Sequence, residues 1–308
     1  MAYSIGIDLG GTKIAGALVS FTGEEAEVLV YEKIAVDGQR RVERVFNDIS
    51  ELVYSLLGKL GKEEKLLGLG IACPGLVDVE RGVMVYSENL NWRNVEVASF
   101  LDPHFDFPLF IEHDVRSGAI AEVFFGVGRE YRNLVYLSVG TGIAGTLVWE
   151  RHIIRGVRGI SAEFGHVVIN PGGPLCRCGN VGCLETLASG GAMEREAYHV
   201  LRQVVDGTTI MQRAKEGVEP FSRIVDRAAH FLGIGLANIA QIFDPEVIII
   251  GGGVAEAGDF WLEQVYRHYQ VHQFWSFPLP PLLLSRFLGK ASVVGAAGLP
   301  WLKKAKFL

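Results

Sequence analysis

The 308-residue sequence has no excess of basic residues, no apolar run long enough to cross a membrane and no Walker A pattern. Its 29 Lys and Arg against 35 Asp and Glu give a net charge of −6, which disfavours sequence-independent binding to nucleic acid, because such binding needs cations that neutralise phosphates. A membrane-spanning helix needs about 20 consecutive apolar residues. The missing Walker A pattern excludes P-loop folds. What remains is an ordinary globular protein of one large or two smaller domains.

Cysteine is also scarce, with four residues in the chain. The N-terminus shows no secretory signal, since Met1 to Asp8 runs directly into a strand-like segment, so we expect a cytoplasmic protein with reduced thiols. Cys73 ends the apolar run Leu66 to Cys73 and is predicted to be a small buried side chain.

The other three cysteines gather in one glycine-punctuated segment, with two acids beside them, Glu163 and Glu185. Four soft metal ligands lie in this segment: His166, Cys176, Cys178 and Cys183. Zinc binds such groups tetrahedrally, and a filled set of four predicts a structural site that holds the two acids in place for a polyhydroxylated substrate. A disulfide between the first two cysteines would close a strained ring, since bridged Cα atoms prefer about 5.5 Å. Free or redox-active thiols stay as the alternative.

Hydrophobic periodicity predicts an α/β protein. In the first part of the chain, a glycine hairpin is followed by a strand, an amphipathic helix, two buried strands and a second helix. These are Ser4 to Asp8 with Ile14 to Val19, about Glu27 to Ile34, Arg41 to Leu57, Leu66 to Cys73 and Leu109 to Glu112, and about Val115 to Phe124.

The same design restarts after Asn133 with a second glycine hairpin, a long helix and another buried strand. These are Leu134 to Val139 with Ala144 to Trp149, Phe221 to Phe243, and Val247 to Ile250. We therefore expect a small N-terminal lobe of residues 1–115 and a large lobe of residues 116–291 that carries the zinc motif. The last helix, residues 292–304, is expected to fold back onto the first lobe.

Glycine turns mark candidate phosphate loops. Asp8 precedes Gly10, Gly11, Thr12 and Lys13, where backbone and side-chain donors can converge on an anion while the acid holds the Mg²⁺ of a nucleotide. An ordinary hairpin turn is the alternative. Gly140, Gly142 and Gly145 match a dinucleotide fingerprint, but the residues that follow are strand-like and the fingerprint needs a helix there. Together with Gly251-Gly252-Gly253, the turns indicate a nucleotide held between two lobes.

Asp114 follows a predicted strand and starts a predicted helix. A helix cap would explain the residue. An acid in this place can also accept the proton of a substrate hydroxyl as that hydroxyl attacks a phosphoryl group.

The chain resembles the ROK family of sugar kinases and sugar-responsive repressors over nearly its whole length. The resemblance is carried by Glu-Phe-Gly-His at 163–166, Cys-x-Cys-Gly-x-x-Gly-Cys-x-Glu at 176–185, Asp8-x-Gly-Gly-Thr, Pro74-Gly75, Asn89, Asp114, Gly140-Thr141-Gly142 and the Gly251 triplet. It implies the actin-like ATPase fold, with two RNase H-like lobes and a ligand cleft between them, and a homo-oligomer, either a dimer or a tetramer.

The resemblance also implies roles for residues. Asp114 is the implied catalytic base on the 6-hydroxyl of a hexose, and Asn89 is an implied sugar contact, for which a simple turn residue is the alternative. The other implied sugar contacts are Gly75, Glu163, His166 and Glu185. The implied phosphate and nucleoside contacts are Gly10, Gly11, Thr12, Gly140, Thr141, Gly142, Gly252 and Gly253.

His113 departs from the family pattern, which has Asn before the catalytic acid. Imidazole offers one donor and one acceptor when neutral, so we expect a sugar contact, with a buried orientation as the alternative. The favoured function is an ATP- and Mg²⁺-dependent kinase, nearest to glucokinase. The alternatives are a kinase for another hexose or an N-acyl hexosamine, a sugar-binding protein with little turnover, and a repressor. A repressor needs a DNA-binding module, for which the few residues before Asp8 leave no room.

Overall fold

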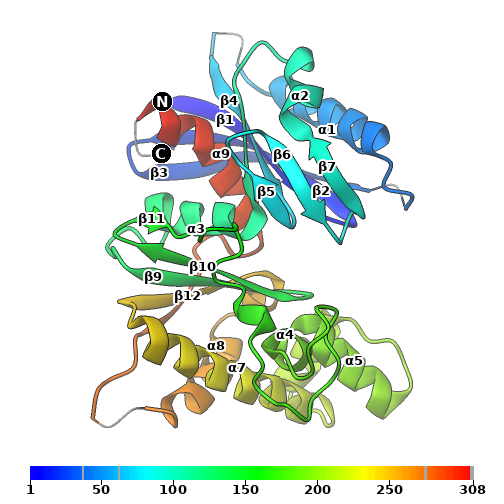
Figure 1. The fold of residues 1–308 in the computed structure, drawn as a ribbon, viewed down its shortest axis with the longest axis vertical. Helices are drawn as coiled ribbons and strands as arrows, with labels where there is room; N and C mark the ends of the chain where they lie inside the picture. Colours follow the sequence, from blue (N-terminus) through cyan, green and yellow to red (C-terminus); the bar gives the residue numbers. More distant parts are fainter. Residues whose placement is uncertain (37, 62, 274–275, 306–308) are drawn as a thin grey trace. The chain divides into compact units, whose positions relative to one another are not determined.

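A computed structural model describes residues 1–36, 38–61, 63–273 and 276–305. The chain forms two compact units, each described here by itself (Figure 1). Unit 1 comprises residues 1–129, 155–160 and 290–308, and unit 2 comprises residues 130–154 and 161–289.

Unit 1 is built on a five-stranded sheet in the order β3-β2-β1-β4-β8. The strands are β1 (Ala2–Leu9), β2 (Lys13–Thr22), β3 (Glu25–Ala35), β4 (Leu66–Cys73) and β8 (Leu109–His113). β1, β2 and β3 are antiparallel neighbours, whereas β1, β4 and β8 run parallel, so the carboxyl ends of these three strands share one edge of the sheet.

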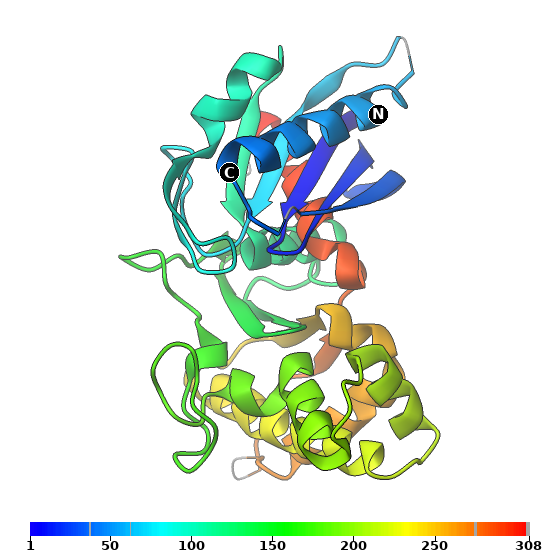
Figure 2. The same cartoon turned by 90° about the vertical axis from the view of Figure 1, so that its right-hand side faces the viewer.

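Helices cover both faces of this sheet (Figure 2). The C-terminal helix α9 (Ala291–Lys304) packs on β1 and β4, where a Cβ on Gly6 would lie 2.0 Å from the carbonyl oxygen of Val293. Only glycine allows this approach. Helix α1 (Val42–Leu57) packs on the other face through Leu52, which contacts Gly16. Gly16 pairs with Ile7, and Ile7 points to the face opposite to that of its neighbour Gly6, because successive residues of a strand alternate between the two faces. The core of unit 1 therefore has two layers, one on each side of the sheet.

The remaining elements of unit 1 follow β4. They are β5 (Leu76–Asp78), β6 (Val83–Ser87) and β7 (Trp92–Glu96), which form a separate three-stranded sheet, then α2 (Val97–Leu101), η1 (Asp102–His104) and α3 (Asp114–Phe125). Helix α3 packs along α9, which explains why it belongs to unit 1.

The expected boundary near residue 115 differs from this division. The first unit runs through Arg129, because α3 buries its apolar residues against α9 instead of starting the second unit. The chain also returns to unit 1 over residues 155–160, a segment with no periodic pattern of its own.

Unit 2 repeats the design with a sheet in the order β11-β10-β9-β12-β13. Its strands are β9 (Leu134–Val139), β10 (Ile143–Trp149), β11 (His152–Ile153), β12 (Val247–Gly251) and β13 (Leu282–Leu284). As in unit 1, an antiparallel hairpin continues into parallel strands.

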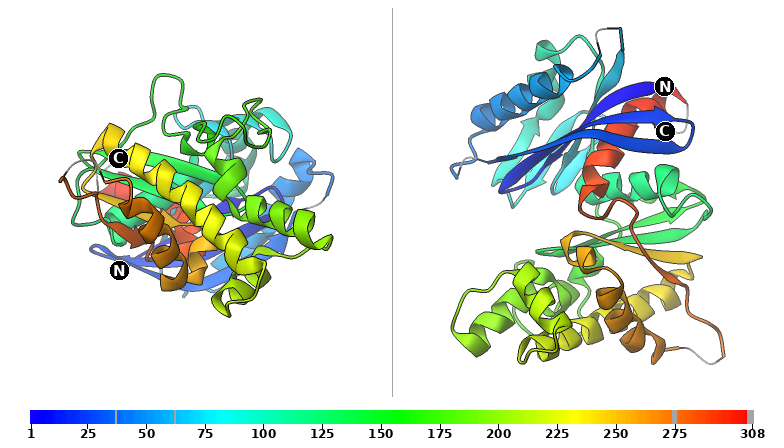
Figure 3. Two further views of the ribbon diagram at one scale, coloured as in Figure 1. Left: turned by 90° about the horizontal axis from the view of Figure 1, so that it is seen from below. Right: turned by 180° about the vertical axis from the view of Figure 1, so that it is seen from behind.

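The helices of unit 2 cluster around one long helix, α7 (Phe221–Phe243), which lies beside α8 (Asp259–Gln270) (Figure 3). The others are α4 (Leu184–Ala188), α5 (Gly190–Leu201), α6 (Gly207–Lys215), η2 (Phe164–His166) and η3 (Gly253–Ala257). Among the described residues, no helix combines the length and the apolar character that a membrane crossing requires.

Candidate active site and metal centre

Three strand ends in unit 1 bring predicted site residues to one edge of the sheet. Asp8 lies near the end of β1 opposite Ala72 of β4, and Cys73 of β4 lies opposite His113 of β8. Asp8 near the end of β1, Gly75 after β4 and Asp114 after β8 thus lie at the carboxyl ends of parallel strands, which is where open α/β sheets bind ligands.

Two acids at this edge interact. Burial and the negative charge of Asp114 raise the pKa of Asp8 to about 7, and Lys33 opposes this rise. Two neighbouring carboxylates with little compensation suit a divalent cation, whose charge would relieve the repulsion. The surroundings of Asp8 are therefore consistent with its predicted role as a Mg²⁺ ligand.

The first glycine turn lies next to Asn89. The N–H of Gly10 donates to the carbonyl oxygen of Lys13 at 2.9 Å, which closes the turn, and a Cβ on Gly11 would lie 3.0 Å from the carbonyl oxygen of Asn89. The side chains of Thr12, Lys13 and Asn89 are exposed and therefore accessible to a ligand.

The junction between β8 and α3 holds the predicted base. Asp114 is the first residue of α3, and its Oδ1 accepts the N–H of Val115 at 2.7 Å and lies 3.3 Å from His113 Nε2. Glu112, only 1% exposed, accepts the N–H of His113 at 2.9 Å and forms an ion pair with Arg155. The main chain beside Asp114 is therefore anchored by a buried charge pair.

Cys73, at the end of β4, is fully buried, which confirms the predicted role as a small buried side chain. Burial, with the nearby acids Asp114, Asp8 and Glu112, raises the pKa of the Cys73 thiol, so it stays neutral.

In unit 2, the second glycine turn is enclosed by main chain from the start of α5 and from the turn after β12. The N–H groups of Gly190 and Gly191, at the start of α5, donate to the carbonyl oxygens of Gly140 and Thr141 at 2.7 and 3.2 Å. Gly252, with φ 84°, leaves room for Val139, because a Cβ there would lie 2.4 Å from the Val139 carbonyl oxygen. β10 starts immediately after this turn, as expected, so the dinucleotide fingerprint is excluded.

Glu185 reaches this turn. Its Oε2 accepts the N–H of Ile143 at 2.9 Å, and a Cβ on Gly142 would lie 2.3 Å from the same oxygen. The carboxylate thereby fixes the end of the turn as well as lying beside the cysteine motif.

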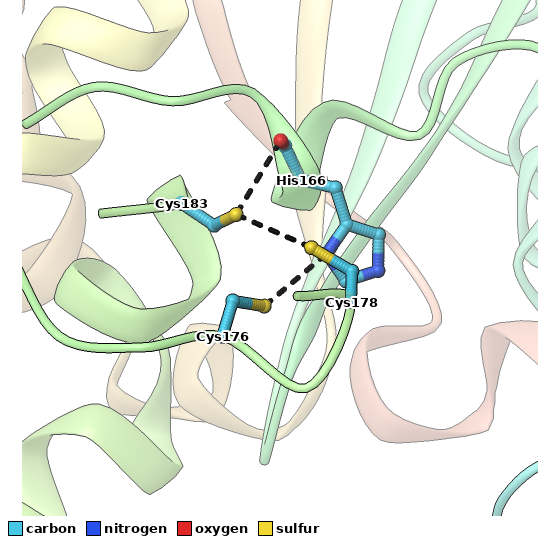
Figure 4. Close-up of side chains that lie close together, drawn as sticks. All are labelled: His166, Cys176, Cys178 and Cys183. Carbon is cyan, nitrogen blue, oxygen red and sulfur yellow. Dashed lines mark hydrogen bonds between the residues drawn. The ribbon is translucent and has the colours of Figure 1, made fainter. Parts of the chain in front are cut away.

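Four ligand atoms converge in the predicted zinc motif (Figure 4). The donor atoms of His166, Cys176, Cys178 and Cys183 all lie within 4.8 Å of one another. The Cys178 and Cys183 sulfurs are 3.6 Å apart, as are Cys176 Sγ and His166 Nδ1. A tetrahedral Zn²⁺ with ligands at about 2.0–2.3 Å needs separations of about 3.5–3.8 Å, so the group fits the metal.

The protonation of the cysteines is also consistent with a bound metal ion. Burial raises the pKa of the Cys183 thiol, so a bound cation is needed to hold it as a thiolate. His166 turns Nδ1 toward the sulfurs, which leaves Nε2 for a second partner (Figure 4).

Glu163 precedes η2 and is exposed. It also lines a cavity of about 250 Å³ whose other walls are mainly apolar residues of α7 and of the segment around η2, among them Phe164, Val167 and Ile242.

Two features of the site were not predicted. One is the pair Gly190-Gly191 after the helix cap Ser189, whose side chain accepts the N–H of Ala192; this Ser-Gly-Gly sequence is the local signal that could have revealed it. The other is the ion pair of Glu112 with Arg155, which no local pattern announces because 43 residues separate the partners.

Comparisons with known proteins identify the family of the chain. The model of the ROK family matches residues 4–303. A glucokinase of Streptomyces coelicolor is 31% identical over 97% of this chain and 98% of its own, and a xylose repressor of Caldicellulosiruptor bescii is 31% identical over 94% of this chain and 76% of its own. The crystal structure of a ROK family glucokinase from Streptomyces griseus in complex with glucose and AMPPNP superposes with a TM-score of 0.84 at 28% identity, over 97% of this chain and 99% of the other. These proteins share the actin-like ATPase fold, and the chain belongs to the ROK family.

Proposed function

We propose that the protein is an ATP- and Mg²⁺-dependent kinase that phosphorylates the 6-hydroxyl of a hexose, and that the hexose is glucose. The observation that carries the proposal is Asp114, an acid fixed at the start of α3 beside Asp8 at the carboxyl ends of parallel strands. Glucokinases among the relatives support glucose as the substrate, and the Streptomyces griseus glucokinase was solved with glucose and AMPPNP.

In this reaction Asp114 accepts the proton of the sugar hydroxyl while the oxygen attacks the γ-phosphate. Because phosphoryl transfer needs little covalent chemistry from the protein, positioning and charge neutralisation supply most of the rate. Asp8 holds the Mg²⁺ that accompanies ATP. The residues proposed to contact phosphates and nucleoside are Gly10, Gly11, Thr12, Lys13, Gly140, Thr141, Gly142, Gly252 and Gly253.

The residues proposed to bind the sugar are Gly75, Asn89, Glu163, His166 and Glu185. Structural Zn²⁺ on His166, Cys176, Cys178 and Cys183 holds the segment that carries three of them. Since carboxylates and amides accept or donate to several hydroxyls at once, this set suits a hexose. Kinases for another hexose or an N-acyl hexosamine use the same chemistry, so the substrate panel decides among them.

A coupled assay of ADP release with ATP and a panel of hexoses tests the function. Asp114→Asn should lower turnover by about 10²–10⁴-fold and leave glucose bound, because the amide keeps the shape of the acid but cannot take the proton. Asp106→Asn, at an exposed position of unit 1, is the matched control. Full turnover in Asp114→Asn contradicts the assignment of the base. A wild-type protein that phosphorylates no hexose but binds one would favour the regulatory function of the xylose repressor relative.

We further propose a homo-oligomer, a dimer or a tetramer, in the cytoplasm. Exposed apolar side chains on unit 2 support the oligomer: Leu175 is 75% exposed and Ile242 is 72% exposed. Light scattering during gel filtration measures the oligomeric state.

A further inference from the structure

His113 is the last residue of β8 and stands directly before Asp114. Its side chain is 16% exposed, and the two ring nitrogens have different surroundings. Nε2 lies 3.3 Å from Asp114 Oδ1, whereas Nδ1 is buried and has no hydrogen-bond partner within the described part of the chain.

The contact with Asp114 requires a proton on Nε2, because a lone pair there would face the lone pairs of a carboxylate oxygen. Nδ1 is buried without a partner among the described residues, and such groups are uncommon in folded proteins. The ring keeps this orientation because Nε2 faces Asp114.

The backbone of His113 is also held in place, by Glu112. The N–H of His113 donates to Glu112 Oε1 at 2.9 Å, and the other oxygen of Glu112 pairs with Arg155. The backbone of His113 is thus held independently of its ring.

The two oxygens of Asp114 are consequently unequal. Oδ1 accepts the N–H of Val115 at 2.7 Å and faces His113 Nε2. For Oδ2, no partner is found in the parts of the chain that the structure describes. One oxygen is held by the protein, and the other is available to a substrate.

We propose that His113 is a positioning residue for Asp114, which holds Oδ1 so that Oδ2 takes the proton of the sugar hydroxyl. The inference rests on the proposed kinase function. In the step, the O6–H bond breaks and its proton goes to Oδ2, O6 forms a bond to the γ-phosphorus of ATP, and the bond from that phosphorus to the bridging oxygen breaks with release of ADP. In this proposal His113 acts through Asp114 and not on the sugar, because the nitrogen that does not face Asp114 is buried.

The test compares His113→Phe, which keeps a ring without a donor, with His113→Gln, whose amide N–H can extend toward Asp114. We expect His113→Phe to lower kcat about 10–100-fold, as misplaced catalytic groups do, while KM for glucose changes less than about threefold. His113→Gln should recover kcat to within about tenfold of wild type. If the Phe variant fails to fold, His113→Leu, which also lacks a donor, takes its place.

The results separate the inference from the function on which it rests. A higher KM for glucose with unchanged kcat, or a changed hexose ranking, makes His113 a sugar contact and overturns the proposal. Unchanged kinetics in His113→Phe, or no recovery in His113→Gln, also overturns it, since only a donor to Asp114 explains both effects. If the wild-type protein phosphorylates no hexose, or Asp114→Asn is fully active, the kinase assignment itself fails.

Discussion

Asp8→Asn should stabilise the ligand-free protein at neutral and alkaline pH while it abolishes kinase activity. Asp8 is partly buried near the carboxyl end of β1, where burial and the charge of Asp114 raise its pKa from 3.8 to about 7. A buried carboxylate beside another one destabilises the fold when ionised. Asn has nearly the same shape without the charge, so the substitution removes this cost.

The sign follows from proton linkage. In the unfolded chain the carboxyl ionises near 3.8, but in the folded chain it keeps its proton until the pH reaches about 7. The penalty is therefore absent below pH 3.8, grows as the pH rises and is complete above about pH 7. At full burial it corresponds to about 4 kcal/mol, at about 1.4 kcal/mol for each tenfold change in proton affinity. Because Asp8 is not wholly shielded from solvent, about half of this value, roughly 2 kcal/mol, is expected.

Calorimetry without nucleotide or Mg²⁺ measures the effect. At pH 8 the transition of unit 1 should rise by roughly 4–8 °C in Asp8→Asn, and at pH 4 it should match wild type. Asp106→Asn, at an exposed position, should change neither. An equal shift at both pH values, or a loss of stability at pH 8, would refute the reasoning, since the ionised carboxylate would then not be the source of the penalty.

Two further predictions concern the anchors of the site. Arg155→Met should lower the free energy of unfolding of unit 1 by about 2 kcal/mol, less than the roughly 3–5 kcal/mol of a fully buried pair because Arg155 is 40% exposed. Adding Glu112→Gln to the same chain should restore part of this loss. Denaturant unfolding measures both effects with Arg158→Met as the control, and an unchanged midpoint in Arg155→Met contradicts the prediction. Cys178→Ser should lose stoichiometric zinc and raise KM for glucose, whereas Cys73→Ala should keep the metal. Elemental analysis and steady-state kinetics measure the two effects. Wild-type protein that is purified without chelator and contains no zinc would contradict the metal site.

Strong local periodicity explains which elements the sequence predicted well. The bounds of β4, β9 and α7 agree with the predicted ranges residue by residue. Each is a mainly apolar run or a helix-period stripe that ends before a polar residue, glycine or proline, so local pattern and tertiary burial favour the same structure. The zinc motif was predictable for a related reason, because 18 residues contain all four ligands at short spacing.

Contacts distant in sequence were not predictable in this way. The sheet of β5, β6 and β7 has strands of three to five residues, too short for a period-2 pattern to stand out. The return of residues 155–160 to unit 1 depends on Arg155 with Glu112 and on the carbonyl oxygen of Gly159, which accepts from Arg116 at 2.6 Å. No local sequence pattern around these residues predicts either contact. The orientation of His113 belongs to the same class, since it depends on which atoms surround the ring.

Glu185 shows why the zinc motif matters beyond the sugar. It follows Cys183 by two residues, and its carboxylate accepts the N–H of Ile143 at the end of the turn Gly140-Thr141-Gly142. A metal ion that fixes Cys183 therefore also fixes the carboxylate that closes this turn, which we propose to contact the phosphates of ATP, within unit 2. Because a Cβ on Gly142 would lie 2.3 Å from that carboxylate, the turn and the acid have little room to move separately. Loss of the metal should consequently weaken the binding of ATP as well as that of glucose.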